Sequence, residues 1–339
     1  MTETLRATIL HGAGYAGGEL IRLLLDHPAV EVASVTSRSQ AGQPVWTTHP
    51  RLRGQTDLEY VAPDAADLEA GVAFVCAEHG QGAAAVQRLR ASGFEGTIID
   101  FSADHRLGDE GTYRAVYGLE HPDPDAMRAA AYGLAEVNAL EVAGAALIAN
   151  PGCFATGISL ALWPLRSLGL EAAVTALTGA SGSGARPSAT THFPNRDGNV
   201  RAYKVLAHRH LAEVRETLGD GAVVHFVPVS GPWTRGIWGT AHVALEDADL
   251  EAVTAAFQDA YRGRPLVRLS PGSLPELLPV VGTPFMDVGW VERDGHVVVG
   301  FALDNLLKGA ASQAVQNLNL SRGWPEALGL LSGVALEDV

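Results

Sequence analysis

Short apolar runs alternate with stretches of helical spacing over roughly the first half of the chain. The helical stretches lie at residues 19–25 and 82–91, and a glycine-rich turn precedes the first of them. The predicted strands around them are 5–10, 30–36, 72–76 and 97–101. Strands that alternate with helices indicate a parallel sheet with right-handed crossovers.

The pattern changes after Asn150. Longer predicted strands with fewer helices between them lie at 174–178, 223–229, 237–245 and 296–303, which is typical of an α+β domain on an antiparallel or mixed sheet. Residues 182–199 are rich in Gly, Ser, Pro, Thr and Asn and predict a long loop. A last helical pattern, 306–318, is expected to pack back onto the first domain.

A chain of 339 residues is long enough for two medium-sized domains. We predict a first domain at 1–150, completed by the C-terminal helix within 305–339, and a second domain at 151–304. The fold class is therefore α/β, with a Rossmann-type doubly wound parallel sheet plus an α+β domain.

Charge and cysteine content exclude several classes of protein. The formal net charge of -14 disfavours nucleic acid and anionic lipid as partners. Two cysteines make no disulfide framework, no Cys/His cluster has zinc-ligand spacing, and no apolar run has the roughly 18 residues of a membrane span. Because residues 1–6 are short and acidic before the first apolar run, we do not expect a signal peptide there. We expect a cytoplasmic protein without a metal site.

The turn after the first predicted strand matches a dinucleotide-binding pattern, Gly12-Ala13-Gly14-Tyr15-Ala16-Gly17. Gly12 allows a tight turn, Gly14 lets the backbone approach a pyrophosphate, and Gly17 permits close helix packing. Tyr15 and Ala16 belong to the same predicted cofactor turn, and the N-terminus of the helix that follows faces the negative charge. The pattern alone is weak, since such turns often serve only the turn, but its place between strand and helix favours a cofactor site.

The end of the second predicted strand indicates which cofactor binds. An NAD site usually places Asp or Glu about 20 residues after the glycines, and here that place reads Thr36-Ser37-Arg38-Ser39. Ser37 and Arg38 suit a 2′-phosphate, so we predict NADP(H). The alternative is that Arg38 is a solvated loop charge.

Cys153 follows the apolar run 145–149 and precedes the helical stretch 155–168, in the sequence Asn150-Pro151-Gly152-Cys153. At a helix N-terminus, free N–H groups favour a thiolate and also stabilise an oxyanion. This predicts a nucleophile, against the usual case of a buried, inert cysteine, which we expect for Cys76.

Several blocks together resemble the N-acetyl-gamma-glutamyl-phosphate reductase family, nearly end to end. They are the 12–17 turn, Asp100-Phe101-Ser102-Ala103-Asp104-His105-Arg106, Tyr132-Gly133-Leu134, Asn150-Pro151-Gly152-Cys153, residues 203–210 and 304–311. The resemblance implies an enzyme of arginine biosynthesis that reduces N-acetyl-glutamyl 5-phosphate to the 5-semialdehyde with NADPH. It also implies kinship with aspartate-semialdehyde dehydrogenases, so that the first domain binds NADP and the second is a catalytic and dimerisation domain.

The resemblance further implies roles for individual residues. His208 is the acid/base, with His210 at a helix start. Independently of the resemblance, Arg106 lies in a loop after a predicted parallel strand and is our candidate for binding the leaving phosphate. Tyr203, Arg209 and Arg235 are expected at the substrate's carboxylate end. The residues expected to close over the cofactor are Ser183, Gly184 and Asn305.

The expected mechanism is covalent. Cys153 attacks the acyl phosphate, a thioester forms, hydride reduces it, and His208 moves protons as the hemithioacetal collapses to aldehyde. We expect a small-molecule substrate and a homo-oligomer, either dimer or tetramer.

Two departures and two rivals stay open. Tyr132-Gly133-Leu134 and Tyr117-Gly118-Leu119 are not followed by the family's Pro-Glu, which puts the contribution of the 135–139 loop to substrate binding in doubt. The nearest rival is a reductase of lysine biosynthesis that acts on an aminoadipyl or glutamyl phosphate attached to a carrier protein. The second rival is a non-catalytic NADP-binding regulator. Such a protein would need neither Cys153 nor His208, yet both are present.

Overall fold

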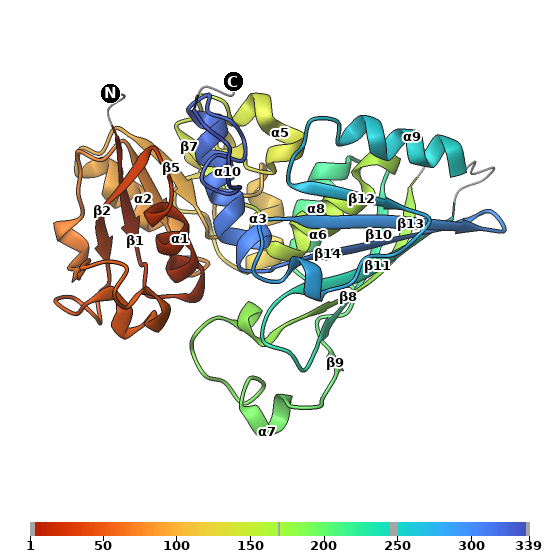
Figure 1. Ribbon diagram of the computed structural model, residues 1–339, viewed down its shortest axis with the longest axis horizontal. Coiled ribbons are helices and arrows are strands. Elements are labelled where there is room, and N and C mark those ends of the chain that lie inside the picture. The colour runs from red at the N-terminus through yellow and green to blue at the C-terminus, as the bar shows by residue number, and fades with distance from the viewer. Residues whose placement is uncertain (1–3, 169, 245–249, 337–339) are drawn as a thin grey trace. The chain divides into compact units, whose positions relative to one another are not determined.

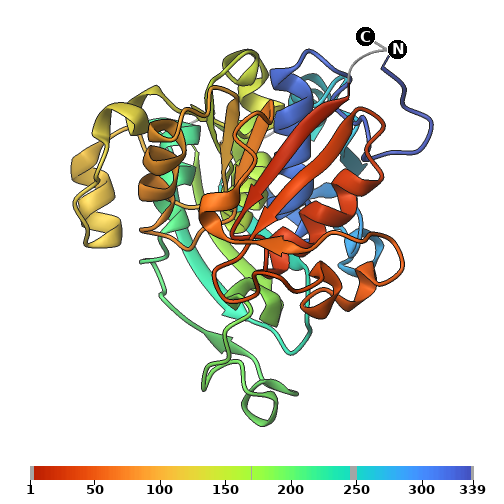
Figure 2. The same cartoon turned by 90° about the vertical axis from the view of Figure 1, so that its left-hand side faces the viewer.

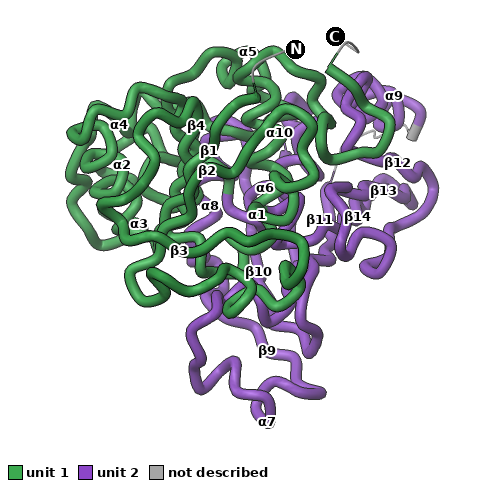
Figure 3. Tube along the Cα trace, turned by 60° about the vertical axis from the view of Figure 1, so that its left-hand side comes forward, with its two compact units in different colours: residues 1–151, 310–339 green, residues 152–309 purple. Residues whose placement is uncertain are grey.

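The computed structural model describes residues 4–168, 170–244 and 250–336 (Figure 1). The chain forms two compact units (Figure 3): unit 1 comprises Met1–Pro151 and Ala310–Val339, and unit 2 comprises Gly152–Gly309. Residues 305–309, which we assigned to the first domain, lie in unit 2. None of the helices in the described ranges has the length and hydrophobicity of a membrane span.

Unit 1 is built on a parallel sheet of seven strands in the order β3-β2-β1-β4-β5-β7-β6. In Figure 2, β1 and β2 run side by side in red. The strands are β1 (Leu5–Leu10), β2 (Val30–Thr36), β3 (Tyr60–Val61), β4 (Val72–Val75), β5 (Thr97–Asp100), β6 (Ala131–Tyr132) and β7 (Leu147–Ala149). All four residues of β4 are buried, as in a sheet covered on both faces. The predicted doubly wound sheet is confirmed.

The helices of unit 1 include one from the end of the chain. They are α1 (Tyr15–Leu25), α2 (Gly82–Ala91), α3 (Glu110–Tyr117), α4 (Pro124–Ala129), α5 (Ala135–Val142) and α10 (Ser312–Ser321). Helix α10 packs against α1, α5 and β5. Its buried Asn317 donates to the carbonyl of Gly133 at 2.8 Å and to the Asn150 side chain at 3.1 Å, so α10 is also fixed by polar contacts.

Unit 2 carries a mixed sheet of seven strands in the order β12-β13-β14-β11-β8-β10-β9 (Figure 1). The strands are β8 (Glu171–Thr178), β9 (Arg201–Ala202), β10 (Val223–Ser230), β11 (Ile237–Ala244), β12 (Val267–Pro271), β13 (Met286–Arg293) and β14 (His296–Leu303). The pairs β8–β10 and β12–β13 are parallel and the others antiparallel. The predicted strand 237–245 is β11, except that Leu245 lies outside the described residues.

Four α-helices accompany this sheet within the described residues: α6 (Cys153–Leu162), α7 (Phe193–Arg196), α8 (His210–Leu218) and α9 (Leu250–Ala260). Helix α6 packs against β11, β14 and α8, and every residue from Phe154 to Leu162 is buried. The predicted helix 155–168 ends early because Pro164 interrupts the helical hydrogen bonds, and a short 3₁₀ turn, Trp163–Leu165, follows.

Candidate active site

The glycine-rich turn joins β1 to α1 in unit 1. A Cβ atom at Gly12 would collide with Val35, and one at Gly17 would collide with the carbonyl of Gly12, so only glycine fits either place. A Cβ at Gly14 would meet nothing within 4 Å, which leaves this backbone open to a ligand. The turn is anchored by the N–H of Gly12, which donates to the carbonyl of Thr36 at 3.0 Å.

The N-terminus of α1 is suited to an anion. Gly14 caps the helix, and the first turn consists of Tyr15, Ala16, Gly17 and Gly18, of which Tyr15 is exposed. The N–H groups and the positive end of the helix dipole are therefore not neutralised by an acid in that turn.

Positive charge gathers at the end of β2. Ser37 is buried and Arg38 is exposed. Burial lowers the pKa of His11, the nearby charges of Arg88 and Arg38 lower it further, and the charge of Glu78 opposes them. Two arginines thus lie near the carboxyl end of β1, and Arg88, on α2, was not selected from the sequence.

His49 supports the turn from a separate segment. Its Nε2 lies 2.9 Å from the carbonyl oxygen of Gly12, and its ring occupies the space that a side chain at Gly18 would need. No local pattern predicts this contact, because it depends on the path of the chain after β2.

Residues 100–106 form a buried polar cluster rather than an open anion site. Asp100 accepts from the Ser102 hydroxyl at 2.7 Å and from His105 Nδ1 at 2.6 Å, and Asp104 accepts the N–H groups of Gly80 and Ala83. Arg106 is 6% exposed, and its Nη2 donates to the carbonyl of Phe101 at 2.7 Å. Part of the guanidinium is therefore engaged within this cluster, and its contact with phosphate stays a prediction.

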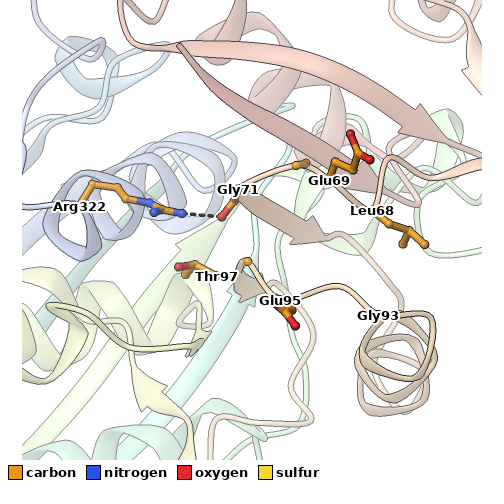
Figure 4. A pocket seen from close by; sticks show the side chains of 9 residues that line it. Leu68, Glu69, Gly71, Gly93, Glu95, Thr97 and Arg322 are labelled. Carbon is orange, nitrogen blue, oxygen red and sulfur yellow. Dashed lines mark hydrogen bonds between the residues drawn. The ribbon is translucent and has the colours of Figure 1, made fainter. Parts of the chain in front are cut away.

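Unit 1 also contains a cavity of about 440 Å³, and Figure 4 shows the residues that line it. It is lined by Gly71 and Thr97 at the amino ends of β4 and β5, whereas the turn follows the carboxyl end of β1. Arg322 lines it and donates to the carbonyl of Gly71. Because ligands of parallel sheets bind at the carboxyl ends of strands, this cavity is not the cofactor site.

Cys153 is the first residue of α6, as the sequence predicts. Gly152 is the N-cap in extended conformation, and the first turn, Cys153 to Thr156, is uncharged. A Cβ at Gly309 would lie 2.6 Å from the Cβ of Cys153, so a glycine is needed behind the thiol. By contrast, burial raises the pKa of Cys76 and the charge of Asp100 raises it further, which suits an inert thiol.

A buried carboxylate that sequence reasoning missed lies beside this helix start. Glu213, on α8, is 1% exposed, and its Oε2 accepts the N–H of Gly152 at 2.9 Å. Its Oε1 lies 4.0 Å from His210 Nε2. The N-cap of α6 is thus held from the neighbouring helix.

His208 lies among aromatic rings next to α6. Its ring centroid is 5.3 Å from that of Phe154 and 5.8 Å from that of Tyr203. The N–H of His210 donates to His208 Nδ1 at 3.2 Å, so the neutral ring carries its proton on Nε2. Burial lowers the pKa of His208 to about 4, and the charges of Arg209 and Lys204 contribute.

Tyr203 lies near Cys153. Burial raises the pKa of Tyr203, the nearby Cys153 raises it further, and the charges of Arg196 and Arg209 act in the opposite sense. Lys204 and Leu206 have positive φ values of 45° and 60°, so the segment before His208 holds a strained backbone, as functional sites often do. Unit 2 thus brings Cys153, Tyr203 and His208 together.

Arg235 and Asn305 are already engaged within unit 2. Arg235 pairs with the buried Asp304. Asn305 accepts the N–H of Gly236 at 2.6 Å and donates to the Ser181 hydroxyl at 3.0 Å. Ser183 and Gly184 are exposed at the start of the predicted loop, and Gly184 has a φ of 80°.

Arg196 is a buried cation that the sequence did not reveal. It is 8% exposed, and its Nη2 donates to the carbonyl of Thr178 at 3.0 Å. Its Nε finds no hydrogen-bond partner among the described residues. A loop composition rich in Gly and Ser gives no sign that one Arg turns inward. The described ranges also hold no cluster of three or more His, Cys, Asp or Glu placed for a metal ion.

Family models match both halves of the chain. Residues 6–145 match the NAD binding domain of semialdehyde dehydrogenase, and residues 153–305 match its dimerisation domain. Solved structures share the fold. Aspartate semialdehyde dehydrogenase II of Vibrio cholerae, complexed with ASA, has a TM-score of 0.74 at 19% identity and covers 94% of this chain and 98% of its own. The enzyme of Candida albicans, solved with NADP, has a TM-score of 0.67 at 13% identity, with coverages of 94% and 99%.

Curated relatives that share a single name have much higher sequence identity to this chain than the solved structures do. The N-acetyl-gamma-glutamyl-phosphate reductase of Methanocella arvoryzae is 44% identical over 336 residues, which is 96% of this chain and 98% of the relative. That of Methanocorpusculum labreanum is 42% identical over 328 residues, with coverages of 95% and 97%. The chain therefore belongs to the N-acetyl-gamma-glutamyl-phosphate reductase family, within the semialdehyde dehydrogenases.

Proposed function

We propose that this protein reduces N-acetyl-L-glutamyl 5-phosphate with NADPH to N-acetyl-L-glutamate 5-semialdehyde and phosphate, as a step of arginine biosynthesis. The observation that carries the proposal is Cys153 at the start of α6, with Tyr203 and His208 beside it. The choice of substrate is supported by relatives named N-acetyl-gamma-glutamyl-phosphate reductase, which align with this chain over nearly their whole length.

The residues of unit 1 fit a dinucleotide. Gly12, Gly14, Tyr15, Ala16 and Gly17 would hold the pyrophosphate, because their backbone is open and the helix end is positive. Ser37 and Arg38 would meet the 2′-phosphate of NADP, with Arg88 adding charge. From unit 2 we assign Ser183 and Gly184 to cofactor binding. We also assign Asn305, because its side chain hydrogen-bonds Ser181 and so holds the loop that carries them. NADPH, when bound, supplies the hydride that reduces the thioester.

The chain's own groups carry the covalent steps. The Cys153 sulfur attacks the acyl carbonyl, a C–S bond forms, and the C–O bond to phosphate breaks; we assign Arg106 to the departing phosphate. After reduction the hemithioacetal hydroxyl gives its proton to His208 as the C–S bond breaks, which returns the thiolate and releases the aldehyde. The N–H groups at the start of α6 would stabilise the oxyanion.

His208 would serve the carbonyl oxygen. With its proton on Nε2, the resting ring is a hydrogen-bond donor toward a developing oxyanion. A bound acyl phosphate is anionic, and negative charge raises the pKa of a neighbouring imidazole. Substrate binding would thereby bring His208 toward the range in which it exchanges protons efficiently.

For the carboxylate end of the substrate we keep Tyr203 and Arg209, which precede α8 on the same segment as His208. Arg235 is the weaker assignment, because Asp304 already compensates its charge.

We further propose that the sheet of unit 2 pairs with that of a second copy. Helices α6 and α8 pack on strands β11, β14 and β10, while β8 and β11 alternate buried with more exposed residues. The more exposed positions of these strands and of β14 include Ala173, Thr175, Trp238, Thr240 and Val298, which are small or apolar, beside the polar Glu171 and His242. Light scattering should give the mass of a dimer or tetramer, and Thr240→Arg should shift the measured mass toward that of a monomer.

Because both cysteines are thiols, we place the protein in the cytoplasm.

The test is an assay of the reverse reaction. The protein is mixed with the semialdehyde, phosphate and NADP, and formation of reduced nicotinamide is followed by absorbance. Cys153→Ser should lower kcat by at least about 10³-fold, whereas Cys76→Ser should leave it within about two-fold. A panel with carrier-linked aminoadipyl and glutamyl phosphates completes the test. Turnover of carrier-linked substrates alone, or an active Cys153→Ser variant, would refute the proposal.

A further inference from the structure

The start of α6 receives its carboxylate from another helix. The first turn of α6 is uncharged, and Glu213 reaches the N-cap from α8. Glu213 is 1% exposed, so its charge is poorly screened by water and interacts strongly with its surroundings. The positive end of α6 compensates part of that charge.

We propose that Glu213 is a positioning residue for Cys153: it fixes the Gly152 peptide and places a negative charge beside the helix start, which disfavours the Cys153 thiolate in the free enzyme. This inference rests on the proposed role of Cys153 as the nucleophile. The hydrogen bond at 2.9 Å joins Glu213 to the residue directly before the thiol, so it sets the direction in which Cys153 leaves the N-cap.

The thiolate and Glu213 compete for the same positive end of α6. A like charge nearby disfavours ionisation, and the effect grows when both groups are shielded from water. Titratable or charged groups from the adjoining segments of unit 2 also surround this helix start, and among the described residues they include Tyr203, Lys204, His208, Arg209, His210, Arg235, Asp304 and Lys308. Arg235 and Asp304 offset each other, and the His208 ring is neutral at pH 7.

A thiol that stays protonated is protected from oxidation and from adventitious acylation. Glu213 therefore lowers the reactivity of Cys153 in the resting enzyme, while it fixes the geometry of the helix start and protects the thiol. Its side-chain amide analogue separates these two effects, because the Oε1 of Gln can still accept the Gly152 N–H but carries no charge.

The test measures iodoacetamide alkylation of Cys153 as a function of pH, with peptide mass spectrometry to distinguish Cys153 from Cys76. Glu213→Gln should lower the midpoint by about one pH unit and keep kcat near that of the wild type at high pH. Glu213→Ala should lower the midpoint too, and also reduce kcat by about ten-fold because the N-cap loses its acceptor. Glu216→Gln, on the exposed side of α8, is the matched control and should change neither.

An alkylation midpoint for Glu213→Gln equal to that of the wild type would overturn the inference. If Glu213→Gln does not fold, Glu213→Asp takes its place: it keeps the charge but withdraws it by one methylene, so a lowered midpoint supports the inference and an unchanged one with normal kcat contradicts it. Alkylation needs no turnover, so the result is separate from the activity of Cys153→Ser, on which the proposed function depends.

Discussion

Arg235 and Asp304 form an ion pair in which Nη2 donates to Oδ1 at 3.0 Å and Nε lies 2.8 Å from Oδ2. The same carboxylate accepts the backbone N–H groups of Gly282 at 2.7 Å and Leu306 at 2.9 Å. An ion pair whose carboxylate has this much backbone support is part of the scaffold of unit 2.

The first prediction follows from this pair. Arg235→Met should lower the free energy of unfolding by about 3 kcal/mol, because it leaves Asp304 buried without its cation. Urea denaturation measures the loss. Were Arg235 instead a substrate ligand, Arg235→Met would keep its stability and raise KM for the semialdehyde, and that result would contradict the scaffold role.

His208 predicts a pH dependence of stability. Its pKa is about 4 in the folded protein and near 6.5 when unfolded, so the unfolded chain binds more protons between these values and stability falls as the pH is lowered through them. The full effect approaches about 3 kcal/mol. The loss of stability between pH 7 and pH 4.5 should be clearly smaller in His208→Gln than in the wild type, and equal losses would speak against a neutral, buried ring.

Arg196 predicts an unusual gain. Burial lowers the pKa of this guanidinium, and the charges that act on it in the described part of the chain come from Tyr203 and Arg201. Replacing a buried, poorly compensated charge by an apolar side chain of similar length stabilises a protein by about 1–3 kcal/mol. Arg196→Met should therefore raise the urea midpoint, while exposed Arg201→Met should leave it within about 0.5 kcal/mol. A destabilised Arg196→Met would show that the charge is compensated.

Cofactor choice rests on the charge near β2. Arg38→Gln should raise KM for NADPH by about ten-fold or more, the effect of losing one charge-assisted contact with a phosphate. KM for NADH should change little, because that cofactor lacks the 2′-phosphate. Arg88→Gln should act in the same direction. If KM changes equally for NADPH and NADH, Arg38 does not bind the 2′-phosphate.

Local signals predicted much of the fold. Strands β1, β2 and β14 and helix α2 have the predicted bounds, because their alternation or helical spacing is complete within each segment. The C-terminal helix begins later than the predicted 306, since a π-helical turn, Leu307–Ala311, comes first. Strands β12 and β13 were not predicted.

Contacts between residues far apart in the chain could not be predicted from local sequence patterns. The place of Cys153 follows from a strand signal and a helix signal that flank it. Glu213 resembles any acidic residue of a helix until its carboxylate is seen on Gly152, 61 residues away in the chain. Arg235 was noticed as an arginine, but its partner Asp304 lies 69 residues away, and no periodicity reports such a pair.

The nesting of unit 2 inside the chain of unit 1 bears on how the protein is made. Helix α10, which packs on α1, α5 and β5, is synthesised only after the whole of Gly152–Gly309. Because domains fold as their residues leave the ribosome, the continuous unit 2 is complete while the nucleotide-binding sheet still lacks a covering helix. The part of the chain translated first is thus among the last to reach its final stability.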